Sequence, residues 1–257
     1  MITSTANAQV KNLAQLIKKS KARTEAGVYI VEGIKMFQEA SKDEIVKAYI
    51  SEELFEKGTL KDSLDGISYE VLKNEVFNHV ADTKTPQGIL CVMKQKKYTL
   101  DQLTAAECPL LLVLENLQDP GNLGTMMRTA EGAGVTGVLL SRGCVDIYNP
   151  KTIRSTMGSI YRVPFLYTDD LLRDMDKLHE KGIVTYAAHL KGKGYYDEES
   201  YQGPTAFLIG NEGNGLSDEV SEKAKQYIKI PMEGKLESLN AAVAAAILMY
   251  EASRQRR

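Results

Sequence analysis

The sequence predicts an α/β protein built from two domains that join near residue 100. Apolar, strand-like runs alternate with stretches of helical spacing along the whole chain, which is typical of α/β folds. A polar, charged stretch over residues 94–107 interrupts this alternation and is the best candidate for a linker. The chain has 257 residues, 43% of them apolar, so two cores can be buried, and its 20 glycines and 7 prolines exclude collagen-like and disordered classes.

The first half of the chain is predicted to form a small α/β/α sandwich. Val10, Leu13, Leu16 and Ile17 recur at helical spacing, which predicts an amphipathic helix over residues 5–20 with its basic side chains outward. Strands and helices then alternate. The predicted strands are 28–31, 45–50, 67–72 and 88–93, and the predicted helices are 33–41, 51–57 and 73–80.

The second half repeats this alternation from residue 109 onward. Its strands are almost wholly apolar, which indicates a sheet covered on both faces and therefore mostly parallel. The predicted strands are 109–115, 135–141, 162–167, 183–190, 205–210 and 227–232. The predicted helices are 122–133, 150–157, 169–181, 216–225 and 238–253. We therefore expect a first domain over residues 1–100, a linker over 101–108 and a second domain over 109–257.

Basic residues gather at both ends of a chain whose net charge is −2. No acid precedes Glu25, whereas five cations do: Lys11, Lys18, Lys19, Lys21 and Arg23. The last four residues include Arg254, Arg256 and Arg257. Such blocks bind nucleic-acid phosphates in some proteins and are only solvated helix surfaces in others, so charge alone leaves both interpretations open.

Composition argues against a metal site, a disulfide framework and a membrane span. The three cysteines (Cys91, Cys108 and Cys144) lie far apart, and the three histidines are equally scattered, so neither type forms a metal-ligand pattern. No apolar run reaches about 18 residues. The first residues also lack the apolar core of a signal peptide. We expect a cytoplasmic protein that holds no metal.

The loop that follows the strand at 109–115 is the first candidate site. It contains Asp119-Pro120-Gly121 and opens a helix that carries Asn122 and, one and a half turns later, Arg128. Ligands of open α/β sheets bind at the carboxyl ends of strands, and helix N-termini attract anions. A tight turn with a solvated arginine is an equally simple interpretation, and the spacing is not that of a dinucleotide-binding GxGxxG motif.

Two further loops have a similar composition. The loop at 210–215 holds three glycines in six residues and places the Glu212 carboxylate in the bend. The third leads to Ser238, a candidate N-cap of the last helix, and to Asn240 in the predicted first turn. None of the loops pairs a nucleophile with His or Cys, and none has the paired carboxylates of a glycosidase, so neither covalent nor glycosidase chemistry is indicated.

The three loops together carry a family resemblance. DPGNLGTMMRTAEGAGV, FLIGNEGNGLSDEV and IKIPMEGKLESLNAAVAAAILMYE occur in this order and resemble the motifs of the SpoU (TrmH-type) RNA 2'-O-ribose methyltransferases of the SPOUT superfamily. The resemblance covers residues 109–257. The first domain, through EAGVYIVEGIKMFQEA, resembles the L30e-like substrate-binding domain of that family.

The resemblance implies a fold, a cofactor and a reaction. The second domain is expected to contain a deep trefoil knot, a feature that general topology rules exclude, and to bind S-adenosylmethionine. The reaction is methyl transfer to a ribose 2'-hydroxyl of RNA, with ribosomal RNA, and within it 23S rRNA, as the expected partner. Relatives pair through the second domain, so a homodimer is expected.

The resemblance also assigns roles to single residues. Those expected to line the cofactor pocket are Leu208, Gly210, Ile230, Met232 and Leu239. Those expected to serve catalysis are Asn122, Arg128, Glu212, Ser238 and Asn240. Those expected to contact RNA are the five cations that precede Glu25.

One residue departs from the family pattern, and other classes of function compete with methyl transfer. Glu237 stands where relatives often have a small or apolar residue, and we expect its side chain to point to solvent. A catalytically silent RNA-binding or ribosome-assembly protein on the same fold would not need the five catalytic candidates. A Rossmann-type oxidoreductase would need the missing GxGxxG. Within the enzyme class, a tRNA methyltransferase and an antibiotic-resistance rRNA methyltransferase share these motifs.

Overall fold

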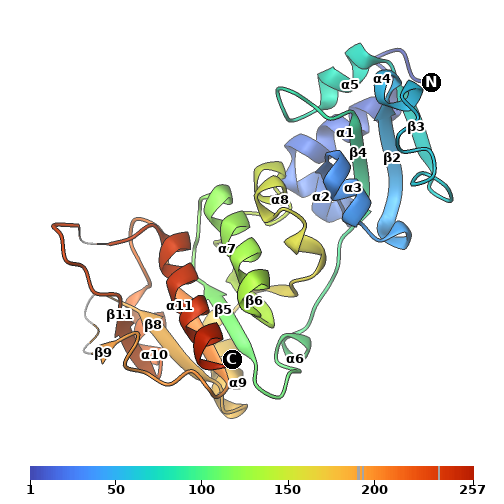
Figure 1. Cartoon of the computed structure of the whole chain (residues 1–257). Coiled ribbons are helices and arrows are strands. Elements are labelled where there is room, and N and C mark those ends of the chain that lie inside the picture. Colours follow the sequence, from blue (N-terminus) through green and yellow to red (C-terminus); the bar gives the residue numbers. More distant parts are fainter. Residues whose placement is uncertain (190–191, 193, 237) are drawn as a thin grey trace. The chain divides into compact units, whose positions relative to one another are not determined.

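The computed structural model describes the whole chain except residues 190–191, 193 and 237. The chain divides into two compact units (Figure 1). The first comprises Met1–Lys96 together with Asp146–Tyr161, and the second comprises Lys97–Val145 together with Arg162–Arg257. The segment 146–161 therefore belongs to the first unit although it lies, in sequence, between two strands of the second.

A four-stranded mixed sheet forms the centre of the first unit. Its strands lie in the order β1-β4-β2-β3, with β4 antiparallel to both β1 and β2, and with β2 parallel to β3. Their bounds are Val28–Glu32 (β1), Ile45–Ser51 (β2), Tyr69–Leu72 (β3) and Ile89–Lys94 (β4). All four predicted strands are confirmed to within two residues.

Short helices surround this sheet. Their bounds are Ala8–Lys18 (α1), Ser20–Ala26 (α2), Ile34–Glu39 (α3), Glu52–Glu56 (α4), Asn74–Val80 (α5) and Pro150–Thr156 (α8), with 3-10 turns at Lys42–Glu44 and Ser159–Tyr161. The apolar positions of α1 that predict it, from Val10 to Ile17, are buried in one core cluster with Phe77 and Leu90. Sequence periodicity does not separate α2 from α1.

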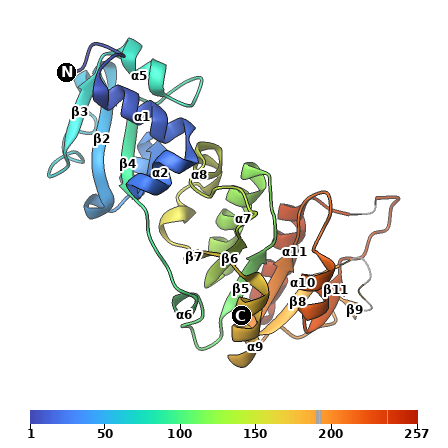
Figure 2. The same cartoon turned by 180° about the vertical axis from the view of Figure 1, so that it is seen from behind.

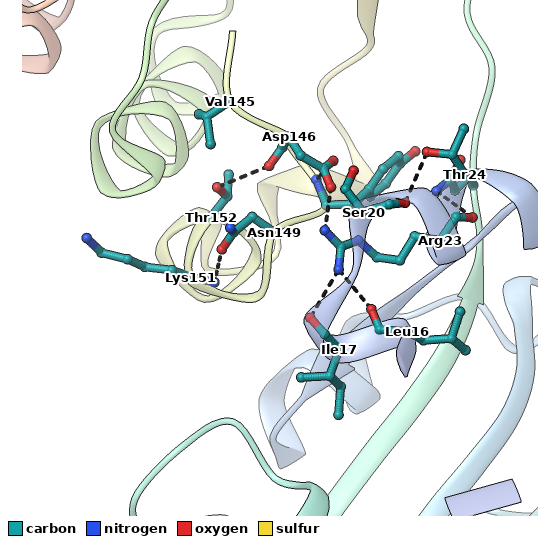
Figure 3. Close-up of polar contacts among 12 residues, drawn as sticks. Leu16, Ile17, Ser20, Arg23, Thr24, Val145, Asp146, Asn149, Lys151 and Thr152 are labelled. Atoms are coloured by element: carbon teal, nitrogen blue, oxygen red, sulfur yellow. Dashed lines mark hydrogen bonds and ion pairs between the residues drawn. The ribbon is translucent and has the colours of Figure 1, made fainter. Parts of the chain in front are cut away.

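Arg23 is one of the five cations expected to contact RNA, but it is buried. Its side chain is only 4% exposed. The guanidinium donates hydrogen bonds to the backbone oxygens of Leu16 (2.8 Å) and Ile17 (3.1 Å), which lie in the last turn of α1, and it pairs with the Asp146 carboxylate (Figure 3). The guanidinium reaches back across the break at Lys19, where the backbone is extended between α1 and α2.

A seven-stranded sheet forms the centre of the second unit, in the order β7-β6-β5-β10-β8-β11-β9. Every strand pairing in it is parallel, as the apolar strands predict. The bounds are Leu110–Leu114 (β5), Gly137–Ser141 (β6), Phe165–Thr168 (β7), Val184–Ala188 (β8), Gly194–Tyr195 (β9), Thr205–Ile209 (β10) and Gln226–Lys229 (β11). The two-residue strand β9 is absent from the sequence prediction, and Leu190, the end of one predicted strand, lies outside the described residues.

The helices of the second unit are Leu100–Leu103 (α6), Pro120–Ala133 (α7), Leu171–Glu180 (α9), Asp218–Lys223 (α10) and Ala241–Gln255 (α11). Helices α7 and α11 lie side by side (Figures 1 and 2). Among the described residues, no helix has both the length and the hydropathy that a membrane span requires. The stretch predicted as a linker contains α6, which begins with a capping box between Thr99 and Gln102.

The start of α11 corrects the prediction that Ser238 is its N-cap. The helix begins at Ala241, and Asn240 is the N-cap, because its side chain accepts hydrogen bonds from the backbone N–H groups of Ala242 (2.9 Å) and Val243 (3.3 Å). Both Ser and Asn cap helices well, so residue type alone does not distinguish them.

Candidate active site

A cleft of about 330 Å³ lies at the carboxyl ends of β10 and β11 and at the start of α11. The loop from Ile209 to Leu216 forms one wall. Residues 228–230 and Met232 form another. The rest of the lining is Ala188, His189, Ser238, Leu239, Ala241 and Ala244. The second and third predicted loops thus meet at one cavity.

Gly210 is required by the close packing of the loop after β10. A Cβ atom built at this position would lie 2.0–2.2 Å from the backbone atoms of Gly215 and Leu216, closer than any side chain allows. Asn211 and Gly215 exchange backbone hydrogen bonds of 2.9 Å in both directions, and Gly215 takes a positive φ of 71°. The loop therefore folds back on the end of its own strand and exposes backbone groups to the cleft.

Glu212, Asn122 and Asn240 connect the three loops by hydrogen bonds. The Asn122 side-chain amide donates to Glu212 Oε1 (3.0 Å). In turn, the Asn240 amide donates to Asn122 Oδ1 (3.0 Å). These three residues, which we call the amide bridge, come from positions far apart in the sequence, and the structure brings them together as candidates for one site.

The Glu212 carboxylate also orders the loop before α7. It accepts hydrogen bonds from the backbone N–H groups of Gln118 (3.0 Å) and Asp119 (2.9 Å). Burial opposes ionisation of Glu212, but the hydrogen bonds from Gln118, Asn122 and Asp119 outweigh it, so the pKa of the carboxyl lies below its usual value. Glu212 is therefore ionised at neutral pH, and its carboxylate holds the loop before α7 in place.

Arg128 and Ser238 remain outside the amide bridge. Arg128 lies on α7 with an exposed side chain, and its guanidinium has no hydrogen bond or ion pair with any residue that the structure describes. Ser238 lines the cleft and is exposed. Both side chains are accessible to a ligand or substrate. Glu237, the departure from the family pattern, lies outside the described residues.

Four of the five predicted cofactor residues line the cleft: Gly210, Ile230, Met232 and Leu239. Leu208 is the exception. It is fully buried in the core of the second unit, among side chains that include Val113 and Leu216, and it does not line the cleft. An apolar residue inside a central strand packs in the core, whereas the loop just after the strand lines the cleft.

The structure adds polar residues that sequence reasoning does not single out. Asn116 takes a positive φ of 53°, uncommon for a residue other than glycine. Its backbone N–H donates to Ser141 Oγ (2.9 Å), and its backbone oxygen accepts from the Asn211 amide (2.9 Å). The buried Glu115 carboxylate accepts from both the backbone N–H (2.8 Å) and the hydroxyl (2.7 Å) of Ser217, the N-cap of α10. An Asn directly after a buried strand is the signal that could have found this cluster.

The cations predicted to contact RNA fall into two groups. Lys11, Lys18, Lys19 and Lys21 are exposed on α1 and α2 or the turn between them, whereas Arg23 is buried. At the other end of the chain, Arg256 donates to the backbone oxygens of Tyr201 (2.8 Å) and Gly203 (2.6 Å) and serves structure. The described residues contain no group of three or more His, Cys, Asp or Glu that could hold a metal ion.

Comparisons with known proteins identify the family of this chain. The model of the SpoU rRNA methylase family matches residues 109–250, and the model of the MRM3-like substrate binding domain matches residues 7–91. The chain is 36% identical to the 23S rRNA (guanosine(2553)-2'-O)-methyltransferase RlmP of Bacillus subtilis, over 97% of each chain. It is 30% identical to the 23S rRNA (guanosine-2'-O-)-methyltransferase RlmB of Vibrio parahaemolyticus, over 89% of this chain and 96% of the relative.

Solved structures match over nearly the full length. The SpoU methyltransferase AviRb from Streptomyces viridochromogenes in complex with AdoMet superposes with a TM-score of 0.87 at 26% identity, covering 97% of this chain and 99% of that one. The AdoMet-bound rRNA methyltransferase from Sinorhizobium meliloti gives a TM-score of 0.86 at 28% identity, covering 98% and 97%. The family match spans more than half of the chain and includes all three predicted loops. The chain belongs to the SpoU rRNA methylase family.

Proposed function

We propose that this protein transfers a methyl group from S-adenosylmethionine to a ribose 2'-hydroxyl of ribosomal RNA, with 23S rRNA as the expected substrate. The amide bridge is the observation that carries the proposal, because it joins all three family motifs beside one cleft. The names of the similar proteins support the substrate and the position of the methyl group.

The cleft fits the cofactor. Its volume of about 330 Å³ is within the range of small-molecule sites. Gly210 keeps the loop backbone close to the strand end, and the Leu239 and Ile230 side chains give the lining an apolar part. When bound, S-adenosylmethionine supplies a methyl group on a sulfonium sulfur. We propose that Gly210, Ile230, Met232 and Leu239 hold it; the knot expected around this site stays a prediction.

The residues of the chain position the acceptor. In the transfer the bond from the methyl carbon to sulfur breaks and leaves its electron pair on the sulfur, which becomes a thioether, a carbon–oxygen bond forms, and the proton of the 2'-hydroxyl is released to solvent. We assign to Arg128 the stabilisation of the developing alkoxide and of the neighbouring phosphate. A guanidinium is not deprotonated in proteins, so Arg128 is not the base. Ser238 is assigned to the ribose and the methionine end of the cofactor, and the amide bridge holds the three loops in place.

The first domain is proposed to hold the RNA. In the proposal, residues 1–100 form this domain, 101–108 the linker and 109–257 the catalytic domain, except that the segment 146–161 belongs to the first unit. The exposed cations Lys11, Lys18, Lys19 and Lys21 are its phosphate-binding side chains. The match of residues 7–91 to a substrate binding domain supports this division. The bacterial rRNA methyltransferases among the relatives support action in the cytoplasm.

A homodimer is part of the proposal. Helix α11 presents Val243 and Tyr250 with about half of each side chain exposed (48% and 49%), and Ile247 between them is half-buried. These positions share one helix face, and an exposed apolar stripe of this kind is a candidate for symmetric pairing. Light scattering at micromolar concentration should give twice the monomer mass of 28.4 kDa. A monomer at that concentration contradicts the dimer but not the reaction.

The reaction is tested by incubating the protein with S-adenosylmethionine and rRNA from a strain that lacks its gene. We expect one new 2'-O-methyl site, mapped in the rRNA, and cofactor binding by calorimetry. Cofactor binding without methyl transfer to rRNA or tRNA would support the silent RNA-binding alternative. Methylation of tRNA alone would overturn the rRNA assignment.

A further inference from the structure

Segment 146–161 is anchored to the first unit at both of its ends. At its start, the Asp146 carboxylate pairs with Arg23, and its other oxygen accepts from the Tyr148 backbone N–H (2.9 Å). At its end, the Tyr161 hydroxyl donates to the backbone oxygen of Met36 (2.9 Å). Arg154 in between pairs with Asp82. We call the Arg23–Asp146 pair the latch.

The latch fixes a geometry more than it stabilises a fold. Arg23 is buried and the Asp146 side chain is 25% exposed, and such a pair contributes little net stability, because the cost of desolvating the charges offsets the attraction between them. Any displacement of Asp146, however, would leave the Arg23 side chain, which is 4% exposed, without its counter-charge. The guanidinium is itself held by two backbone oxygens of α1, so Asp146 has one favoured position (Figure 3).

The residues just before Asp146 are hydrogen-bonded to the loop before α7, which Glu212 orders in the second unit. Val145 donates its backbone N–H to the Leu117 oxygen (2.8 Å), and the Leu117 N–H donates to Cys144 Sγ (3.4 Å). The Gln118 side-chain amide donates to the Gly143 oxygen (2.5 Å). Gln118 and Asp119 are the residues whose backbone N–H groups bind Glu212.

One peptide bond therefore separates a residue fixed to the proposed RNA-binding unit from a residue fixed to the catalytic loop. We propose that the latch positions the loop 116–119. When the first unit binds RNA, the latch holds Asp146, and through Val145 and Leu117 it orders this loop, to which Glu212 is also bound. Arg23 and Asp146 act through Val145 and Leu117 and touch neither cofactor nor substrate. The inference rests on the proposed function.

The coupling predicts a separation of rate from binding. Displacing a catalytic loop by about 1 Å costs up to about 100-fold in rate. We expect Asp146→Asn, which keeps the size of the side chain and the bond from Tyr148, to lower kcat about 10- to 100-fold. RNA and S-adenosylmethionine affinities should stay within about threefold, because the residues assigned to both lie elsewhere. A purely structural defect would lower them together.

Hydrogen exchange gives a second, activity-independent readout. In the wild type, adding an rRNA fragment should slow exchange of the amides at 117–119, and in Asp146→Asn this RNA-dependent protection should be lost. Lys57→Met is the matched control, since it removes an exposed ion pair with Glu53 from the same unit and should change neither kcat nor protection.

A double variant separates coupling from folding. Replacing a buried ion pair by apolar side chains is often neutral for stability, so Arg23→Met with Asp146→Leu should unfold at a temperature near that of the wild type and still lack the coupling. Wild-type kcat or wild-type loop protection in this folded double variant overturns the latch. An inactive wild type that binds no RNA would instead overturn the proposed function, and the latch with it.

Discussion

At the scale of the residue, Arg128 carries the sharpest catalytic prediction. It is exposed and unpaired among the described residues, and it shares α7 with Asn122 of the amide bridge. Removing one group that stabilises a developing oxyanion costs about 10²–10³ in rate. We expect Arg128→Ala to lose methyl transfer to this extent while calorimetry shows cofactor affinity close to that of the wild type. The control is Arg173→Ala, because Arg173 is an exposed arginine on a different helix, α9. A rate above about a tenth of wild type would refute the assignment.

Glu212 makes a prediction about pH. Its folded-state pKa is depressed, because the hydrogen bonds to its charged form outweigh the effect of burial. Its contribution to stability is therefore fully present above the unfolded-state pKa of about 4.3 and is lost as pH falls through the lower folded-state value. Glu212→Gln should lower the melting temperature by a constant amount between about pH 6 and 8, and the difference from wild type should shrink below about pH 4. A difference in melting temperature that grows toward acid pH would contradict the role of the ionised Glu212 carboxylate in stability.

The role of a residue can be predicted where a sequence motif contains it. It cannot be predicted from local sequence where a contact with a distant residue determines its environment. Asn122, Glu212 and Asn240 are all candidates from their motifs, and the structure joins them by hydrogen bonds. Arg23 is predicted to contact RNA, yet its environment depends on Asp146, 123 positions away. Leu208 lies in the core and not in the cleft lining, because the glycine-rich loop, and not the strand before it, borders the cleft.

At the scale of the element, the first residue before α11, Asn240, is both the N-cap of the helix and a member of the amide bridge. Asn240 uses its oxygen to cap the helix and its amide to reach Asn122, so one side chain serves stability and the amide bridge. Asn240→Ala should lose both, including about 0.5–2 kcal/mol of stability for the missing cap. Asn240→Asp keeps a capping oxygen but has no amide to donate. We expect urea unfolding to show near-native stability for the Asp variant, and kinetics to show reduced activity for both variants. Full activity of the Asp variant would remove Asn240 from the site.

Most elements follow from periodicity, and the exceptions have physical reasons. The parallel sheet of the second unit is predictable because strands covered on both faces are apolar throughout. The strand β9 is two residues long, and α6 is a single turn, so neither has enough residues to show a period. The break between α1 and α2 falls at Lys19, where the backbone becomes extended although the residue types favour a helix.

At the scale of the whole molecule, α8 complicates any simple division at residue 100. The chain leaves the second unit after Val145 and returns at Arg162, and the residues between belong to the first unit. Ile147, Ile153 and Ile160 of this segment are at most 2% exposed. A truncation that removes residues 1–96 alone therefore leaves these apolar side chains without the unit that they belong to.

Two truncations test the division of labour. Deleting residues 1–96 should give an aggregation-prone protein. The same deletion with 146–161 replaced by a Gly/Ser linker should fold and bind S-adenosylmethionine, because the whole cleft lies in the second unit. Its RNA affinity should fall, and the slope of log K against log salt should flatten by about 0.7–0.9 for each RNA phosphate that the protein no longer neutralises.

Charge supports this direction: the first unit carries a net charge of +2 and the second a net charge of −4, so the catalytic unit is poorly suited to hold RNA unaided. A full-length variant with Lys11, Lys18, Lys19 and Lys21 changed to Gln is the matched comparison, since it lacks the exposed cations and keeps both units. If these lysines bind the phosphates, its salt slope should approach that of the linker variant while its cofactor affinity stays unchanged. RNA binding by the linker variant with unchanged affinity and salt dependence would show that the first unit is not the substrate-binding module.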